Sequence, residues 1–340
     1  MLPAYPSSEP DPASIAVLVE PPALPPVPVE EFQQEIAAAA DFTLAALAPA
    51  TRRAYRSDFL RFGIWCRRRG LVDLPAEPET VAVFLASEAA AGLKPATIAR
   101  RAAAIRYAHG LDRKQPPTST LHVRATVAGI RRRAGTAPQP KTPATARLIA
   151  AMVELAPTDM VRGLRDRALL LLGFAGAFRR SELVALHVED LVETPNGLRV
   201  AIRKSKTDQE DAGQEVAIPH GARLQPVEAV RAWLDAAGIA SGPVFRRVRK
   251  YGLIGEALTA EAVALVVKRY ADGAGFRSED FAGHSLRAGF LTSGAENGAS
   301  VFKLMEVSRH KSMDTLRGYV RRAELFKDYA GAEFLQAMLT

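Results

Sequence analysis

Apolar side chains between residues 36 and 135 recur every three or four positions, which is the spacing of one face of an α-helix. The first apolar stripe consists of Tyr55, Phe59, Phe62 and the pair Trp65–Cys66. Three further segments repeat the pattern and each ends in glycine, at residues 77–92, 94–110 and 119–135. The pattern predicts an all-α bundle in this part of the chain.

The pattern changes after residues 136–145, "TAPQPKTPAT", whose prolines indicate a linker. Apolar and polar positions then alternate over residues 186–220, as in β-strands, and Pro195-Asn196-Gly197 is typical of a hairpin turn. A longer turn at residues 204–214 joins the next two strands. Helical spacing predicts helices at about residues 144–155, 164–177, 224–237, 259–272, 285–297, 300–308, 312–321 and 323–338. This second region is expected to be mixed α+β, mainly helical with a small antiparallel sheet.

Proline marks the start of the chain, where residues 1–30 contain nine of the 23 prolines. Because proline fixes φ and removes a hydrogen-bond donor, this segment is expected to be extended and disordered. A length of 340 residues also favours two domains. The predicted division is an acidic, proline-rich arm (1–35), a helical domain (36–135), a linker (136–145) and a second domain (146–340).

Charge is distributed unevenly along the chain, whose formal net charge is +8. Residues 1–51 contain seven acidic residues and no lysine or arginine. The remainder therefore holds all 45 basic residues but only 30 of the 37 acidic ones, a net charge of +15. A strongly basic body favours a nucleic-acid partner. The alternative is a chain that uses arginine freely on an ordinary surface.

Several classes of protein are excluded by composition. No apolar run approaches the roughly 20 residues of a membrane span, and the N-terminus has no basic segment followed by an apolar one, as a secretory signal would. The single cysteine, Cys66, excludes an internal disulfide and suits a reducing cytosol. The six histidines show no HExxH or similar spacing. We expect a cytoplasmic protein with no bound metal.

Arginine and lysine gather on the polar faces of the predicted bundle. Such charges can grip a phosphate backbone without reading its sequence. Each of them alone is more typical of a solvated surface, so the inference depends on their number over four helices. The candidate DNA contacts in this domain are Arg52, Arg53, Lys94, Arg100, Arg101, Arg106, Arg131 and Arg132.

Five stretches of the second domain carry residues suited to chemistry: "FAGAFRRSELVAL", "RKSKTDQ", "GHSLRAG", "SRHKS" and "LRGYVRRAELF". Taken singly, each has an ordinary explanation as an ion pair, a solvated turn, a helix cap or a half-buried ring. Taken in order, they supply two arginines, a lysine, two histidines and a tyrosine. Metal-free phosphodiester transfer needs such a set, because arginines stabilise the phosphate charge and a tyrosine can act as nucleophile. The residues are Arg179, Glu182, Lys206, His284, Arg287, His310 and Tyr319.

These segments resemble the tyrosine recombinase (phage integrase) family. Its pattern is R-x-x-E, a β-hairpin lysine, H-x-x-R, a histidine or tryptophan, and a tyrosine nine residues later. The resemblance covers nearly all of the chain except the arm, and it is closest to the Cre-type branch in "LPAEPETVAVFL", "VFRRVRKYG" and "RGYVRRAELFKDYAGAEFLQAML". It implies a site-specific DNA recombinase or integrase that needs neither metal nor ATP nor any other cofactor.

The resemblance also implies an architecture and partners. The helical domain would be a core-binding domain, and the second domain would be catalytic. Together they would form a C-shaped clamp around double-stranded DNA, and four protomers would synapse two sites. The helix at 323–338 would dock into a neighbouring protomer, although an ordinary helix folded onto its own domain is the alternative. The location would be the bacterial cytoplasm, at the nucleoid.

Roles for single residues follow from the same resemblance. Arg179 and Arg287 would clamp the scissile phosphate, and Tyr319 would attack it to give a 3′-phosphotyrosyl link. Glu182 would hold the scaffold of the site, and His284 would assist proton transfer.

The remaining roles concern the leaving group and the phosphate oxygens. Lys206 would be the general acid for the 5′-hydroxyl, with Lys204 as the less favoured candidate and otherwise a DNA contact. His310 would hydrogen-bond the phosphate, and Arg317 would contact DNA.

Two positions depart from the family pattern. Arg309 stands where glycine is common before the last histidine, and Arg180 stands where an apolar residue is common. Neither removes a reacting group, but Arg309 could add a phosphate contact or alter the local turn.

Two other functions use similar residues. A type IB-like topoisomerase would rejoin the same strand ends, and a DNA-binding protein could carry an inactive site. Retention of all seven polar positions argues against an inactive site. The DNA target, the direction of recombination, any accessory proteins and the role of the arm stay open.

Overall fold

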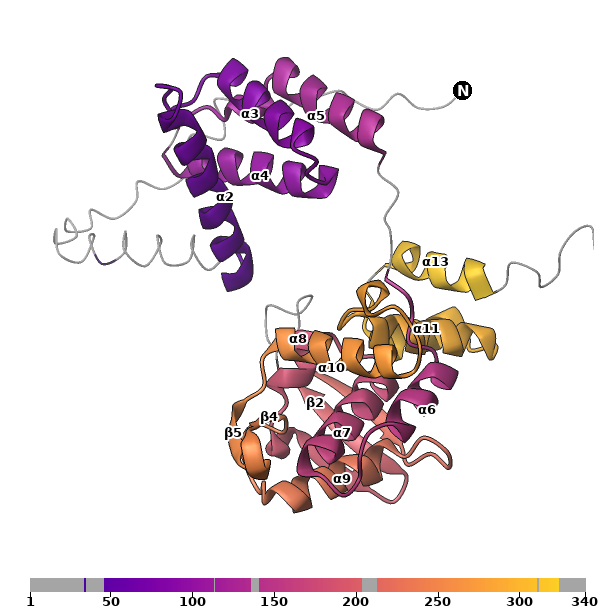
Figure 1. Cartoon of the computed structure of the whole chain (residues 1–340). Coiled ribbons are helices and arrows are strands. Elements are labelled where there is room, and N and C mark those ends of the chain that lie inside the picture. The colour runs from indigo at the N-terminus through magenta and orange to yellow at the C-terminus, as the bar shows by residue number, and fades with distance from the viewer. Residues whose placement is uncertain are drawn as a thin grey trace, which may run out of the picture. The chain divides into compact units, whose positions relative to one another are not determined.

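The computed structural model describes residue 34 and residues 46–112, 114–135, 141–203, 213–310 and 312–323. The chain divides into two compact units, Met1–Ala137 and Pro138–Thr340 (Figure 1). The predicted arm (apart from residue 34), residues 204–212 and residues 324–338 of the last predicted helix lie outside the described residues.

The N-terminal unit is a helical bundle in its described residues. Helix α2 packs on α4, and α3 packs on α5. Phe62, Cys66 and Phe84 are buried between them. Three of these helices begin with a proline, which suits the first helical position because its missing N–H would have no partner there. The helices are α2 (Pro49–Arg67), α3 (Pro78–Ala90), α4 (Pro95–Leu111) and α5 (Leu121–Ala134), with a 3₁₀ turn at Pro117–Ser119.

The C-terminal unit is mainly helical and is built around α7, whose run Leu169–Leu172 is fully buried. A helix that is apolar on all sides must be covered on all sides. Helices α6, α9 and α11 pack against α7 and cover it (Figure 1). The helices are α6 (Ala146–Glu154), α7 (Val161–Ala175), α8 (Arg180–Ala185), α9 (Pro226–Ala237), α10 (Ala260–Gly273), α11 (Ser285–Glu296), α12 (Val301–Ser308) and α13 (Met313–Ala323).

A three-stranded antiparallel sheet has the order β1 (Leu191–Thr194), β2 (Gly197–Ile202), β3 (Gln214–Pro219). The predicted hairpin turn joins β1 to β2, and Gly197 has φ = 143°, a conformation that side chains disfavour. Leu198 on β2 pairs with Ile218 on β3, and both are buried. The expected fold class, a helical bundle plus a mainly helical α+β region, is confirmed for the described residues.

A second antiparallel pair was missed by the pattern analysis: β4 (Arg246–Val248) and β5 (Ile254–Ala257). These strands are three and four residues long and carry charged side chains, so they have too little alternation to be recognised. Short 3₁₀ turns lie at Val188–Asp190, Lys250–Gly252 and Ser278–Asp280. The region 141–145 of the predicted linker is held by the C-terminal unit, since the N–H of Thr142 donates to the carbonyl of Asp280 and that of Ala144 to Ser285.

In the ranges that the structure covers, every helix is too short or too polar to cross a membrane.

Candidate active site

Helix α8 begins beside a buried ion pair. Arg179 is the residue before the helix, and its backbone N–H donates to Glu182 Oε2 at 2.9 Å. The Arg179 guanidinium also donates to Glu182 Oε1 at 2.5 Å. The Glu182 side chain is only 1% exposed, whereas that of Arg179 is 17% exposed. Arg179 therefore keeps one side of its guanidinium toward solvent while the carboxylate fixes the other.

Arg287 lies on the first turn of α11 and is fully buried. It donates from Nη1 to the carbonyl of Ala177 at 2.8 Å, and its Nη2 is 3.3 Å from both ring nitrogens of His310. His284 precedes the same helix and is exposed. The H-x-x-R spacing thus gives one buried arginine and one accessible histidine.

The segment after α12 contributes Ser308, Arg309 and His310. Arg309 ends α12 in the left-handed conformation, with φ = 57°. Its guanidinium is buried and donates to Glu182 Oε2 at 2.8 Å. The guanidinium groups of Arg179 and Arg309 therefore bind the same carboxylate, the first at Oε1 and the second at Oε2.

Ser308 fixes the proton of His310. The Ser308 hydroxyl donates its only proton to the Leu304 carbonyl, so toward His310 Nδ1, 2.7 Å away, it must accept. On this basis we assign the proton of the neutral His310 ring to Nδ1. Its Nε2 is left as an acceptor, toward which Arg287 can donate.

Tyr319 lies on α13, which packs on α11 and α12 (Figure 1). Its ring is half-buried against a small apolar cluster formed by Leu291, Ala295, Leu304 and Leu316. A negative charge on Tyr319 would raise the pKa of Arg287, so the phenol lies within electrostatic reach of that guanidinium.

Positive charge is concentrated at this site. Burial, followed by the charges of Arg179 and Arg309, lowers the pKa of Arg287 to about 9. Burial and the nearby Arg287 and Arg179 lower the pKa of His310 to about 4. His284 is open to solvent on one side, but the protein around it removes part of its hydration, and this desolvation with the charges of Arg287 and Arg179 lowers its pKa too. Bringing an anion here would relieve this repulsion, which makes the site suited to a phosphate.

Glu182 is the negative group at the centre of these cations. Burial alone would raise its pKa, but the charge of Arg309 and the hydrogen bonds from Arg179 outweigh burial and lower it. Glu182 is therefore ionised at neutral pH. Among the described residues, no group of histidine, cysteine and acidic side chains could hold a metal ion.

The structure brings together six of the seven predicted catalytic residues. They are Arg179, Glu182, His284, Arg287, His310 and Tyr319. Lys206 and the alternative Lys204 lie outside the described residues. Arg317 is exposed and donates to Asp314 at 3.2 Å.

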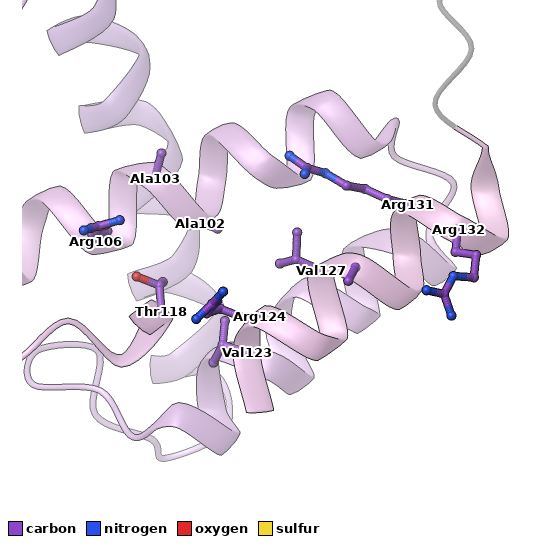
Figure 2. Close-up of a pocket in the computed structure, with 10 residues that line it drawn as sticks. Ala102, Ala103, Arg106, Thr118, Val123, Arg124, Val127, Arg131 and Arg132 are labelled. Atoms are coloured by element: carbon purple, nitrogen blue, oxygen red, sulfur yellow. The ribbon is translucent and has the colours of Figure 1, made fainter. Parts of the chain in front are cut away.

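Most candidate DNA contacts of the N-terminal unit are exposed. Arg53, Lys94, Arg106, Arg131 and Arg132 are on the surface, and Arg52 is half-buried. Arg106, Arg131 and Arg132 line a groove of about 680 Å³ between α4 and α5. Figure 2 shows Arg124 among the residues that line the same groove, together with Ala102 and Val127.

Arg100 and Arg101 depart from the expected polar face. Arg101 is buried against Asp58 and Glu88, so it faces the interior of the bundle rather than solvent. Arg100 is 51% exposed, yet it donates from Nε to Asp58 at 2.7 Å. The sequence periodicity placed both on the surface because it does not reveal which helices pack there.

The contribution of Arg309 and Ser308 was also missed. The sequence offered one signal for Arg309, the replacement of a common glycine, and none for Ser308. Their partners lie on other helices or one turn earlier, so only the folded chain shows them.

Comparison with known proteins identifies the class of enzyme that this fold and site define. A model of the phage integrase family matches residues 145–325. The chain is 40% identical to an integrase/recombinase XerD homolog of Selenomonas ruminantium over 289 residues, covering 83% of this chain and 84% of the relative. It is 30% identical to tyrosine recombinase XerC of Xanthomonas campestris pv. campestris (strain B100), covering 82% and 85%.

A solved structure shares the fold. The Tn1549 transposon integrase in complex with transposon right end DNA superimposes with a TM-score of 0.59 at 14% identity, covering 85% of this chain and 96% of that chain. This likeness concerns the fold alone.

The chain has the catalytic pattern of enzymes that break and rejoin DNA strands. It belongs to the phage integrase family and is a tyrosine recombinase. The finer resemblance to the Cre-type branch stays a prediction.

Proposed function

We propose that this recombinase cuts and rejoins duplex DNA through a covalent link between Tyr319 and a 3′-phosphate. One observation carries the proposal: Arg287 is buried beside His310, within electrostatic reach of Tyr319 and of Arg179. The start of α8, helix α11, the end of α12 and helix α13 are far apart in sequence, and the nearness of the four groups that they supply supports a phosphate site.

In the proposed first step, Tyr319 Oη attacks the phosphorus and the bond from phosphorus to the 5′-oxygen breaks. Arg179 and Arg287 bind the non-bridging oxygens, where charge accumulates in the transition state. The phosphate ester of DNA becomes a phosphate ester of tyrosine. Its bond energy is retained, and the reverse attack by a 5′-hydroxyl rejoins a strand without ATP.

Two protons must move during this step. The proton of the Tyr319 phenol passes to His284, whose lowered pKa keeps it neutral and able to accept. The departing 5′-oxygen receives a proton from Lys206, an assignment that depends on the family pattern because this residue lies outside the described ones.

His310 is proposed to bind the phosphate. Because Ser308 accepts from Nδ1, a hydrogen bond from His310 to a phosphate oxygen needs a proton on Nε2. A bound phosphate favours that proton, since an adjacent negative charge raises the pKa of an imidazole. His310 would thus change from a neutral to a charged ring as DNA enters.

The two units would have different roles, DNA binding in the N-terminal unit and catalysis in the C-terminal unit. We propose that the N-terminal unit grips the DNA backbone with Arg53, Arg106, Arg131 and Arg132 and that both units form a clamp. Four protomers would join two sites, linked by the helix predicted at 323–338. We expect the protein at the nucleoid in the bacterial cytoplasm, with accessory proteins left open.

Covalent trapping on nicked duplexes tests the proposal. A nick near the cleavage position lets the fragment that carries the new 5′-hydroxyl dissociate, so the protein–DNA link accumulates and survives denaturation. Duplexes would come from DNA flanking the gene and from a random nicked library. Wild type should form the adduct, and Tyr319→Phe should form none while still binding DNA, because it lacks only the nucleophilic oxygen.

The matched control is Tyr251→Phe, which removes a hydroxyl from a side chain that is 97% exposed. It should form the adduct as the wild type does. Adduct formation by Tyr319→Phe at the wild-type rate, or no adduct by the wild type on either set of duplexes, would overturn the proposal.

A further inference from the structure

Arg309 occupies a position where the backbone favours glycine. It ends α12 with φ = 57° and ψ = 42°, the left-handed conformation that glycine adopts at many helix ends. A side chain at this position is strained. An arginine is therefore unexpected here unless its side chain contributes something that glycine cannot.

The Nη1 and Nη2 groups of the Arg309 guanidinium have buried partners, whereas its Nε has none among the described residues. The guanidinium donates to Glu182 Oε2 at 2.8 Å, to the Gly176 carbonyl at 3.1 Å and to the Ala177 carbonyl at 3.2 Å. It lies over the ring of Phe178, 5.2 Å from the centroid. The side chain is only 3% exposed, so it cannot itself reach DNA without leaving this pocket.

Two of these partners, Glu182 and the Ala177 carbonyl, also hold a group of the phosphate site. Glu182 accepts from the Arg179 guanidinium through Oε1 and from the Arg179 backbone N–H through Oε2. The Ala177 carbonyl accepts from Arg287 as well as from Arg309. His310 follows Arg309 directly in the chain. One buried guanidinium therefore connects the supports of Arg179, Arg287 and His310.

We propose that Arg309 is a positioning residue of the recombinase site, which orients Arg179 and Arg287 through Glu182 and the Ala177 carbonyl and fixes the backbone from which His310 projects. The inference rests on the proposed function. A lysine could supply the charge but not the fork of donors that spans three acceptors.

The charge of Arg309 also acts on its neighbours. The titratable and charged groups around it are Arg179, Glu182, His284, Arg287 and His310, together with Glu215 and Glu306, which line a groove of about 460 Å³ beside Arg309. Glu306 binds Lys303 and Glu215 binds Arg199, so these two carboxylates are engaged elsewhere.

Removing Arg309 would therefore change the pH dependence of cleavage. Its charge lowers the pKa of Glu182 and, more weakly, that of His310. Without this charge both pKa values rise, so Glu182 is protonated at a higher pH than in the wild type. The acid limb of the pH–rate profile should move to higher pH.

The experiment compares Arg309→Gly, Arg309→Lys and wild type in single-turnover cleavage of a nicked duplex. Arg309→Gly deletes the guanidinium and suits the backbone, so a slower reaction cannot come from backbone strain. Arg309→Lys keeps the charge, and it tests the inference if the glycine variant does not fold. The control is Arg165→Ala, which removes a buried arginine bound to Asp166 Oδ1 at 2.6 Å and to the Arg246 carbonyl.

We expect Arg309→Gly to cleave on the order of 10²-fold more slowly at saturating DNA, as misplaced catalytic groups do. Its acid limb should shift upward while DNA affinity stays near that of wild type. Arg309→Lys should lose part of the rate with little shift of the limb. Arg165→Ala should lower the unfolding temperature but leave the acid limb of the pH–rate profile unchanged.

Three results would contradict the inference. Wild-type cleavage by Arg309→Gly is one, and full cleavage by Arg309→Lys is another. The third is a loss of rate in Arg309→Gly that is fully accounted for by the fraction of unfolded protein, while the acid limb of its pH–rate profile stays where it is in the wild type. A wild type that forms no adduct overturns the proposed function instead, and this inference with it.

Discussion

At the scale of single residues, the site combines backbone strain with dense hydrogen bonding. Ala177 and Arg309 both have positive φ, 46° and 57°, and they contact each other through the Ala177 carbonyl. Such conformations cost of order 1–3 kcal/mol each and persist where the surroundings enforce them. Here the enforcing contacts are those to Glu182 and Arg287, so the strain lies where the catalytic groups are held.

Ser308→Ala tests the assigned proton of His310. The variant removes the acceptor of the Nδ1 proton, so the fraction of Nδ1-protonated ring should fall, as read from ¹⁵N NMR of labelled histidine. The cleavage rate should decrease several-fold, because one neutral hydrogen bond contributes about 1 kcal/mol. An unchanged ring spectrum would show that Ser308 does not set the tautomer.

The stability of the DNA-free protein should fall as the pH falls from about 6.5 toward about 4. The pKa of His310 is lowered from 6.5 to about 4 in the folded chain. In this window the unfolded chain binds a proton that the folded chain does not, so acid favours unfolding. The lowered pKa of His284 acts in the same direction. Urea unfolding across these pH values measures the slope.

His310→Gln is the comparison for that measurement. Glutamine does not titrate, so part of the pH dependence between about 6.5 and 4 should disappear. A slope equal to that of the wild type would mean that His310 is not held neutral by the fold.

The sequence predicted the reacting groups but not their supports. Arg179, Arg287 and His310 follow one another in a spacing that points to phosphate chemistry. Arg309 supports them through Glu182, which lies 127 residues earlier in the chain. A contact over that separation has no local pattern, so sequence reasoning offered for Arg309 only a phosphate contact or an altered turn.

At the scale of elements, the tyrosine depends on a small satellite core. Helix α13 packs on α11 and α12 through Leu291, Leu304 and Leu316, apart from the main core around α7. A cluster this small can open without unfolding the rest of the unit. The position of Tyr319 is thus set by few contacts, and we expect it to be adjustable.

Leu316→Ala should loosen α13 selectively. Leu316 is fully buried, and such truncations cost about 2–5 kcal/mol. Amide exchange should accelerate in α13 while α7 stays protected, and the adduct rate should fall with DNA affinity retained. Leu170→Ala in α7 is the matched control, because it should instead lower the stability of the whole unit. Equal exchange changes in both helices for Leu316→Ala would contradict a separate satellite core.

The helices were predictable because their apolar stripes are long. The predicted helix at 285–297 and the observed Ser285–Glu296 agree within one residue. The strands β4 and β5 were not predictable, since each is held by its partner strand rather than by its own alternation. Burial of Arg101 was missed for a related reason: its neighbours Asp58 and Glu88 come from other helices.

At the scale of the whole molecule, charge determines how DNA binding should respond to salt. Removing one arginine that binds a phosphate should reduce the slope of log K against log [salt] by about 0.9. Arg131→Gln and Arg132→Gln remove exposed charges from the groove between α4 and α5. Filter binding at several salt concentrations should therefore show a shallower slope for each variant.

Arg100→Gln provides the control for this prediction. Its guanidinium is already bound to Asp58, so its removal should change the slope less than the removal of Arg131. A larger effect for Arg100 than for Arg131 and Arg132 would place the DNA-binding surface elsewhere on the bundle.

The decisive measurement for the proposed mechanism is to identify the residue that carries the DNA. The trapped adduct would be digested with nuclease and protease, and the modified peptide sequenced by mass spectrometry. The mechanism predicts a nucleotide linked through its 3′-phosphate to Tyr319. A nucleotide on any other residue, or one linked through its 5′-phosphate, would contradict it.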